Sequence, residues 1–170
     1  ECLAANPTAP THEECNEIYV GGPGLGAPLE CESVATKDFD NEGRPTRQIY
    51  YFGLDRYEVR PDINQSLERL GKCLEIISSD KQLVSVLITG HTDAIGIESY
   101  NDQLSDRRAQ AVFDAMINTD PFNDPENRSK FLAPKGEGDR TPLVSSDTAR
   151  KNKSNRRVEI AFEYSVPSEN

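Results

Sequence analysis

Apolar residues recur at alternating spacings of four and three between positions 61 and 78. In a helix this spacing places them on one stripe, which would pack against a core. Pro61 suits the first helical turn, where its missing N–H group costs no hydrogen bond. The pattern therefore predicts an amphipathic helix over this segment. Its apolar stripe consists of Ile63, Leu67, Leu70, Leu74 and Ile77.

Three further stretches have the patterns of strands. Residues 49–52 are β-branched and aromatic and are followed by Gly53, which ends the run. Residues 83–89 form a dense apolar run before Gly90, as expected for a central strand buried on both faces. Residues 158–163 alternate between apolar and polar types, which predicts one face on the core and one in water. A shorter strand is expected at residues 131–134.

A second helix is expected over residues 99–118. Ser99 with Asp102 three positions later resembles a capping box, and Pro121 prevents continuation. The elements then follow the order β-α-β-α-β-β. This order predicts an α/β sandwich, in which a mixed sheet of about four strands is covered by two main helices.

The pattern is lost at both ends of the chain and in one internal segment. Residues 1–45 are rich in proline and contain the glycine-rich run 21–26, so we expect an extended arm. Residues 46–165 would form the folded domain, and residues 166–170 a C-terminal tail. Residues 120–130 are expected to be a polar loop.

Composition narrows the class of protein. A chain of 170 residues fits one domain with an appendage, and no apolar run approaches the roughly 20 residues of a membrane helix. A formal net charge of -10 would repel a phosphate backbone, so nucleic acid is not an expected partner. A zwitterionic or neutral partner suits the chain better. No metal site or cofactor is expected, because the cysteines lack paired short spacings and only two histidines are present.

The four cysteines indicate one or two disulfides, with unpaired thiols as the alternative. Cys2, Cys15 and Cys31 crowd the arm and Cys73 lies in the first helix, so three connectivities are possible. Disulfides would place the chain in an oxidising compartment such as the periplasm. No basic, apolar leader precedes Glu1, as expected of a mature or trimmed form. Whether a lipid was attached near Cys2 stays open.

One charged residue of the second helix lies on its apolar side. Asn101 and Arg108 fall on the same side of the helix as Leu104, so Arg108 faces inward and needs an acid, a carbonyl or a ligand as partner. Asp93, just beyond the end of the central strand, is the nearest acid. Ligands gather at such strand ends, and an opposed Asp and Arg can bind the ammonium and carboxylate of a zwitterion. Spacing alone leaves open whether Asp93 and Arg108 only pair with each other.

Several ungapped motifs together resemble the OmpA-like C-terminal domain family over about residues 48–164. They are Gly90-His91-Thr92-Asp93, Gly96, Tyr100-Asn101, Leu104-Ser105, Arg108-Ala109 and Asn155-Arg156-Arg157-Val158-Glu159-Ile160, with Pro61, Gly136, Gly138 and Pro142 in the order that the family shows. The resemblance implies noncovalent binding of peptidoglycan through the diaminopimelate of its stem peptide. It also implies a periplasmic protein associated with the outer membrane of a Gram-negative bacterium.

The resemblance assigns roles by position. Asp93 and Arg108 match the principal ligand contacts, Asn101 and Leu104 line the pocket, and Arg156 closes its edge. Supporting positions are His91, Thr92, Gly96 and Ser105. The arm, the long 120–130 segment and Cys73 depart from the family pattern, which suggests contacts with another envelope protein through the arm or that segment.

The sequence also contains features of two other functional classes. His91, Asp93 and Ser105 lie close enough in sequence to suggest a hydrolase, but no nucleophile elbow or open metal triad accompanies them. Glycoside cleavage would need a second carboxylate beside Asp93, for which Glu98 is the available residue. We therefore expect no enzymatic activity. The remaining alternative is a structural subunit of a secretion or motor assembly, whose domain serves mainly protein–protein contacts.

Overall fold

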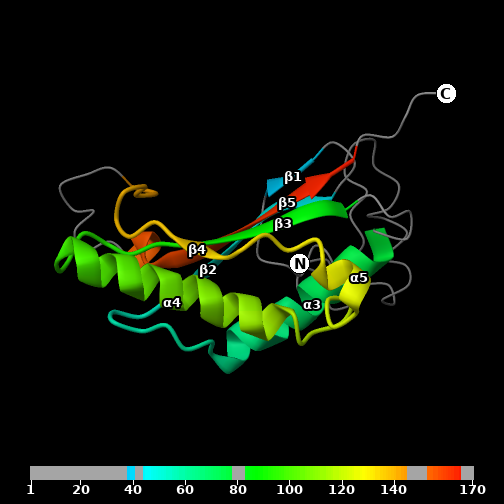
Figure 1. Ribbon diagram of the computed structural model, residues 1–170, viewed down its shortest axis with the longest axis horizontal. Coiled ribbons are helices and arrows are strands. Elements are labelled where there is room, and N and C mark those ends of the chain that lie inside the picture. Colours follow the sequence, from blue (N-terminus) through cyan, green and yellow to red (C-terminus); the bar gives the residue numbers. More distant parts are fainter. Residues whose placement is uncertain (1–37, 41–43, 78–82, 145–152, 166–170) are drawn as a thin grey trace, which may run out of the picture.

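The computed structural model describes residues 38–40, 44–77, 83–144 and 153–165. These residues form a five-stranded sheet in the order β1-β2-β5-β3-β4, with the two long helices on one of its faces (Figure 1). The strands are β1 (Asp38–Phe39), β2 (Pro45–Tyr51), β3 (Leu83–Gly90), β4 (Lys135–Gly136) and β5 (Arg157–Tyr164). The helices are α3 (Pro61–Ile77), α4 (Glu98–Met116), α5 (Pro125–Arg128) and the short 3-10 helix η2 (Lys153–Asn155). The predicted α/β sandwich is confirmed.

The direction of the strands brings three chain segments to one edge of the sheet. Both β2 and β3 pair antiparallel with β5, through partners such as Tyr50 with Val158 and Ile88 with Ile160. Strands β2 and β3 therefore run parallel, and their carboxyl ends meet beside the start of β5. The segments that follow β2, follow β3 and precede β5 are neighbours there, although they lie far apart in sequence.

The sheet differs from the prediction at its two margins. Residues 38–39, which the sequence pattern assigned to the arm, form the edge strand β1, where Asp38 pairs with Arg47. Two residues are too few to show a strand period, so the pattern missed them. At the other edge β4 lies at Lys135–Gly136, whereas Phe131, in the predicted strand, makes only an isolated bridge to Val86.

The core lies between the sheet and the helices. Alternate residues of the central strands, among them Tyr50, Val86, Ile88, Val158 and Ile160, are buried against α3 and α4. The predicted stripe of α3 supplies the other side, with Ile63, Leu67, Leu70 and Leu74 all buried. The side chain of Ile77 falls outside the described residues. None of the described helices is long and apolar enough to cross a membrane.

Cys73 belongs to the same buried face of α3. Its side chain has no exposed surface, and it is bonded in a disulfide. The arm cysteines, the arm itself up to residue 37 and the tail from residue 166 lie outside the described residues. The cysteine pairing and the role of the arm therefore stay predictions.

Helix α4 begins without the predicted capping box. Its N-cap is Ile97, which has extended backbone angles and provides no side-chain hydrogen bond, and Ser99 lies inside the first turn. The predicted inward side of this helix is nevertheless correct, because Asn101, Leu104, Arg108 and Val112 are all buried.

The 120–130 segment, predicted to be a polar loop, contains a short helix. This helix is α5, whose N-cap Asp124 accepts hydrogen bonds from the backbone N–H groups of Glu126 and Asn127. Pro125 occupies the first helical position. Both residues are ordinary signals of a helix start that the polar composition of the segment obscured.

Candidate functional site

A cleft opens at the edge of the sheet where β2 and β3 end. Its volume is about 300 Å³. Its walls come from the segment after β2, the segment after β3, the first turns of α4 and the residue before β5, as the strand directions require. The lining residues are Leu54, Asp55, Thr92, Asp93, Ile95, Gly96, Tyr100, Asn101, Leu104, Arg108 and Arg156.

Arg108 joins α4 to the two strand ends beneath this cleft. Its Nη1 donates to the carbonyl oxygen of His91 at 2.7 Å, after β3. Its Nε and Nη2 donate to the carbonyl oxygens of Arg56 at 2.7 Å and Gly53 at 3.0 Å, after β2. The side chain is fully buried. Three backbone carbonyls thus serve as the partners that the inward arginine requires. Among the described residues, no carboxylate forms a hydrogen bond with Arg108.

Asp93 is paired with Arg156 and not with Arg108. The Oδ2 atom of Asp93 lies 2.9 Å from Nη1 of Arg156, and both side chains are nearly inaccessible to solvent. Arg156 also donates through Nε to the carbonyl oxygen of Phe52 at 3.2 Å. The alternative of a closed pair between Asp93 and Arg108 is therefore not what the structure contains, because Arg156, 63 positions away, reaches the acid instead.

Asp93 keeps capacity for further hydrogen bonds. Its Oδ1 accepts only the backbone N–H of Ile95, at 3.3 Å, and a carboxylate offers about four lone-pair sites. Beside it, the side-chain amide of Asn101 donates to the carbonyl oxygen of Asp93 at 3.4 Å, which fixes the turn after β3 against α4. An ammonium group entering the cleft could bond to Oδ1 of Asp93, a residue that lines the cleft.

Two buried arginines, Arg108 and Arg156, lie with the carboxylate of Asp93 at the floor of the cleft, and a second lining carboxylate, that of Asp55, lies at its mouth. Burial lowers the pKa of Arg108 to about 10; Asp93 opposes this shift, and Arg156 adds to it. The guanidinium remains charged at neutral pH. Its lowered pKa indicates that the surrounding groups offset only part of the cost of removing the charge from water. An anionic group such as a carboxylate would offset the remainder.

The mouth of the cleft is bridged by Asp55 and Tyr100. The hydroxyl of Tyr100, in the first turn of α4, donates to a carboxylate oxygen of Asp55, after β2. Asp55 has a positive φ of 53°, a conformation that side-chain-bearing residues seldom adopt and that aspartate tolerates better than most. The bridge ties together the two segments that Arg108 joins from below.

The structure brings together most of the predicted site residues. Asp93, Asn101, Leu104, Arg108 and Arg156 all line the cleft, as do Thr92 and Gly96. Ser105 does not. Its hydroxyl donates to the carbonyl oxygen of Asp102 at 2.8 Å and accepts the backbone N–H of Gly138 at 2.9 Å, so it ties α4 to the segment after β4.

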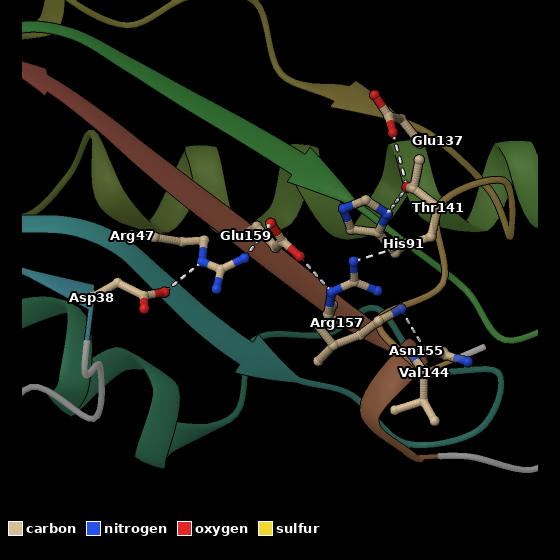
Figure 2. A network of polar contacts seen from close by, with 10 residues as sticks. Asp38, Arg47, His91, Glu137, Thr141, Val144, Asn155, Arg157 and Glu159 are labelled. Carbon is tan, nitrogen blue, oxygen red and sulfur yellow. Dashed lines mark hydrogen bonds and ion pairs between the residues drawn. The ribbon is translucent and has the colours of Figure 1, made fainter. Parts of the chain in front are cut away.

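His91 also lies outside the cleft, in a polar network on the sheet face opposite the helices (Figure 2). Its Nδ1 is 3.0 Å from the hydroxyl of Thr141, which donates to Glu137. Arg157 occupies the same network, bonded to Glu159 and to the carbonyl oxygen of Thr141. Burial, with the nearby charge of Arg157, lowers the pKa of His91 to about 4. Both His91 and Ser105 are held away from Asp93, so the three do not share one site.

Sequence reasoning missed Leu54, Asp55, Ile95 and Tyr100 as lining residues. A usable signal existed for the first two. They follow the end of a strand, and parallel strands place their carboxyl ends at a common edge where ligands bind. The signal required knowing that β2 and β3 are parallel, which depends on β5 lying between them.

A mixed sheet with helices on one face and a charged cleft at its strand ends defines an α/β sandwich domain. Residues 51–156 match the model of the OmpA family, and the chain belongs to that family.

The chain is 34% identical over 112 residues to outer membrane protein A of Bordetella avium, a match that covers 65% of this chain and 52% of that protein. It thus spans about half the length of this curated relative. The cell wall anchor of the T6SS from Pseudomonas aeruginosa is similar in structure, with 28% identity, a TM-score of 0.50 and coverage of 71% of this chain and 83% of that one. The peptidoglycan-associated lipoprotein from Burkholderia pseudomallei shares the fold, with 24% identity, a TM-score of 0.51 and coverage of 68% and 89%.

Proposed function

We propose that this domain binds peptidoglycan noncovalently by holding the diaminopimelate of the stem peptide in the cleft. The observation that carries the proposal is the arrangement of Asp93, Arg108 and Arg156, one acid and two arginines buried at the floor of an accessible cleft. Diaminopimelate presents both an ammonium and a carboxylate. Asp93 would accept from the ammonium group, and the arginines would hold the carboxylate through charge-assisted bonds.

The family supports anchoring to the cell wall in general terms. The chain belongs with outer-membrane and periplasmic envelope proteins and is itself periplasmic, associated with the outer membrane. The names of two structural neighbours, a cell wall anchor and a peptidoglycan-associated lipoprotein, describe the same kind of role. We propose that this chain anchors an envelope protein or complex to the wall.

We further propose that the domain is not an enzyme. The distribution of polar groups supports this, because Ser105 bonds to Asp102 and Gly138, and His91 bonds to Thr141 on the far face of the sheet. A general base must lie within hydrogen-bond reach of the group that it activates, and neither residue faces the cleft floor. A muralytic assay tests this: release of wall fragments that depends on Asp93 would contradict it.

We also propose that the domain contacts other envelope proteins. Helix α5 contains no buried residue, so its surface is available for contact with another envelope protein. The arm is the second proposed contact surface, and a lipid near Cys2 is a proposed membrane anchor. Both lie outside the described residues. Deleting residues 1–37, or exchanging exposed residues of α5, and then measuring co-purification with envelope proteins would separate the two surfaces.

Co-sedimentation with diaminopimelate-type peptidoglycan tests the binding function. Asp93→Asn removes the negative charge with little change in volume and should abolish sedimentation. Asp102→Asn is the matched control, because Asp102 also pairs with an arginine, Arg140, but does not line the cleft. Circular dichroism must show that both variants are folded. Undiminished sedimentation of a folded Asp93→Asn variant would reject the site.

A further inference from the structure

Three large apolar side chains line the cleft yet remain exposed. Leu54 is 59% exposed, and Ile95 and Tyr100 are each 43% exposed. Single exposed apolar residues are ordinary, but several around one concave site mark a contact surface. Leu54 follows β2, Ile95 follows β3 and Tyr100 lies in α4, so they surround the charged floor from different sides.

The apolar rim is held in place by the polar contacts beneath and across it. The bond between Tyr100 and Asp55 fixes the aromatic ring on one side. Arg108 holds the carbonyl oxygens of Gly53 and Arg56, the neighbours of Leu54 and Asp55, on the other. The backbone at Ile95 is held by its N–H group, which donates to Oδ1 of Asp93. A rim that is already ordered loses little conformational entropy when a ligand covers it.

The floor and the rim favour different parts of one ligand. Charge complementarity at the floor selects a group with ammonium and carboxylate functions, and the rim favours a small apolar group next to it. We infer that the ligand is a peptide in which an apolar side chain flanks the diamino acid, so that Leu54, Ile95 and Tyr100 recognise the neighbouring residue and free diaminopimelate binds more weakly. This inference rests on the proposed function and specifies its ligand.

The test is calorimetric titration of the 170-residue chain with three ligands. They are free diaminopimelate, a peptide in which alanine follows diaminopimelate, and the same peptide with glycine in place of alanine. Burial of one methyl group corresponds to about a three- to fourfold change in affinity. The alanine peptide should therefore bind about three- to fourfold more tightly than the glycine peptide.

Substitutions of Leu54 and Ile95 test whether the apolar rim causes the difference in affinity between the two peptides. Leu54→Ser and Ile95→Ser should weaken the alanine peptide by up to about three- to fourfold and should weaken free diaminopimelate less. Leu132→Ser and Val84→Ser are matched controls, because both residues are 50% exposed and neither lines the cleft. They should leave the affinity for every ligand unchanged.

The outcomes separate the two proposals. Equal affinity for all three ligands, or a rim variant that weakens free diaminopimelate as much as the peptide, overturns recognition of the neighbouring residue while leaving the charged floor as the binding site. Failure of all three ligands to bind overturns both proposals. Tighter binding of the alanine peptide that disappears in Leu54→Ser supports the rim.

Discussion

The carboxylate of Asp93 and the guanidinium of Arg156 lie 2.9 Å apart inside the protein, although 63 positions separate them in the chain. Asp93 follows the end of β3, and Arg156 precedes the start of β5, so the pair joins two neighbouring antiparallel strands at one edge of the sheet. It also orients the acid at the floor of the cleft. The same contact therefore serves both the stability of the domain and the proposed site.

Replacing Arg156 by methionine should lower the free energy of unfolding by about 3 kcal/mol, because it leaves the buried Asp93 charge without its partner. Urea denaturation monitored by circular dichroism measures this change. Arg140→Met provides the control. Arg140 pairs with Asp102 at the surface, where such pairs contribute about 1 kcal/mol or less.

A second change distinguishes a lost ion pair from lost packing. Adding Asp93→Leu to Arg156→Met removes the unpaired charge and should restore part of the lost stability. If Arg156→Met lowers the free energy of unfolding no more than Arg140→Met does, the pair of Asp93 and Arg156 does not stabilise the fold.

Replacing Arg108 by lysine should destabilise the domain by about 3 kcal/mol. A lysine retains the charge but cannot reach three carbonyls that belong to His91, Gly53 and Arg56, and each lost bond to a charged donor contributes about 1.5 to 3 kcal/mol. Urea denaturation measures the change in the free energy of unfolding. Arg107→Lys, at the neighbouring exposed position, is the control and should change it little. Equal effects of the two substitutions would refute the structural role of Arg108.

The sequence predicted the architecture because its main elements carry strong periodic patterns. The α3 stripe from Ile63 to Leu74 and the alternation in β5 each have several apolar positions with one period. By contrast, β1 and β4 contain two residues each, too few for any period, and their pairing is set by neighbouring strands. The α4 start was misplaced because Ser99 and Asp102 have the spacing of a cap, while the backbone turns at Ile97.

The stability of the domain should fall as the pH is lowered from about 6.5 towards 4. The pKa of His91 is about 4 in the fold and about 6.5 when unfolded, so the unfolded chain binds the extra proton over this range. The stabilising contribution is complete above pH 6.5 and is lost as the pH falls through 4. It amounts to about 3 kcal/mol at most.

The groups around His91 make a matched variant necessary. Arg157, Lys135, Glu137 and Glu159 all act on its ring, and other carboxylates titrate near pH 4. His91→Asn should flatten the difference in unfolding free energy between pH 7 and pH 4.5, measured by urea denaturation, relative to the unsubstituted chain. An unchanged difference would show that His91 does not contribute to it.

Gly90→Ala should destabilise the domain strongly, by several kcal/mol. A Cβ atom at Gly90 would overlap the carbonyl oxygen of Ser105, a backbone atom of α4 that cannot move without shifting the helix from the sheet. Gly53→Ala is the control, since there the nearest atom is the flexible Cγ of Arg56, at 3.2 Å. Thermal unfolding measures both, and a melting temperature of Gly90→Ala equal to that of Gly53→Ala would disprove the close approach.

Spacing alone indicated only those site residues that lie in one short stretch, whereas Arg156 was assigned to the pocket edge by the family resemblance. Asp93, Asn101, Leu104 and Arg108 follow one another within a strand end and a helix, so their common location was visible from spacing. The partner of Asp93 was not, since Arg156 reaches it through the pairing of β3 with β5. Two of the three carbonyls that Arg108 holds, those of Gly53 and Arg56, were not predicted either, because they belong to a segment after β2 that is far away in sequence.

The meeting of three distant segments at one sheet edge has a mechanical consequence. A molecule held on the cleft floor would touch the ends of β2 and β3, the start of β5 and α4 together, through Arg108 and Arg156. Tension applied to that molecule would be shared among α4 and three strands that are joined by the hydrogen bonds of the sheet. The bound molecule would then be released by its own dissociation or by unfolding of this edge of the domain. Displacement of a single loop would not be enough to release it.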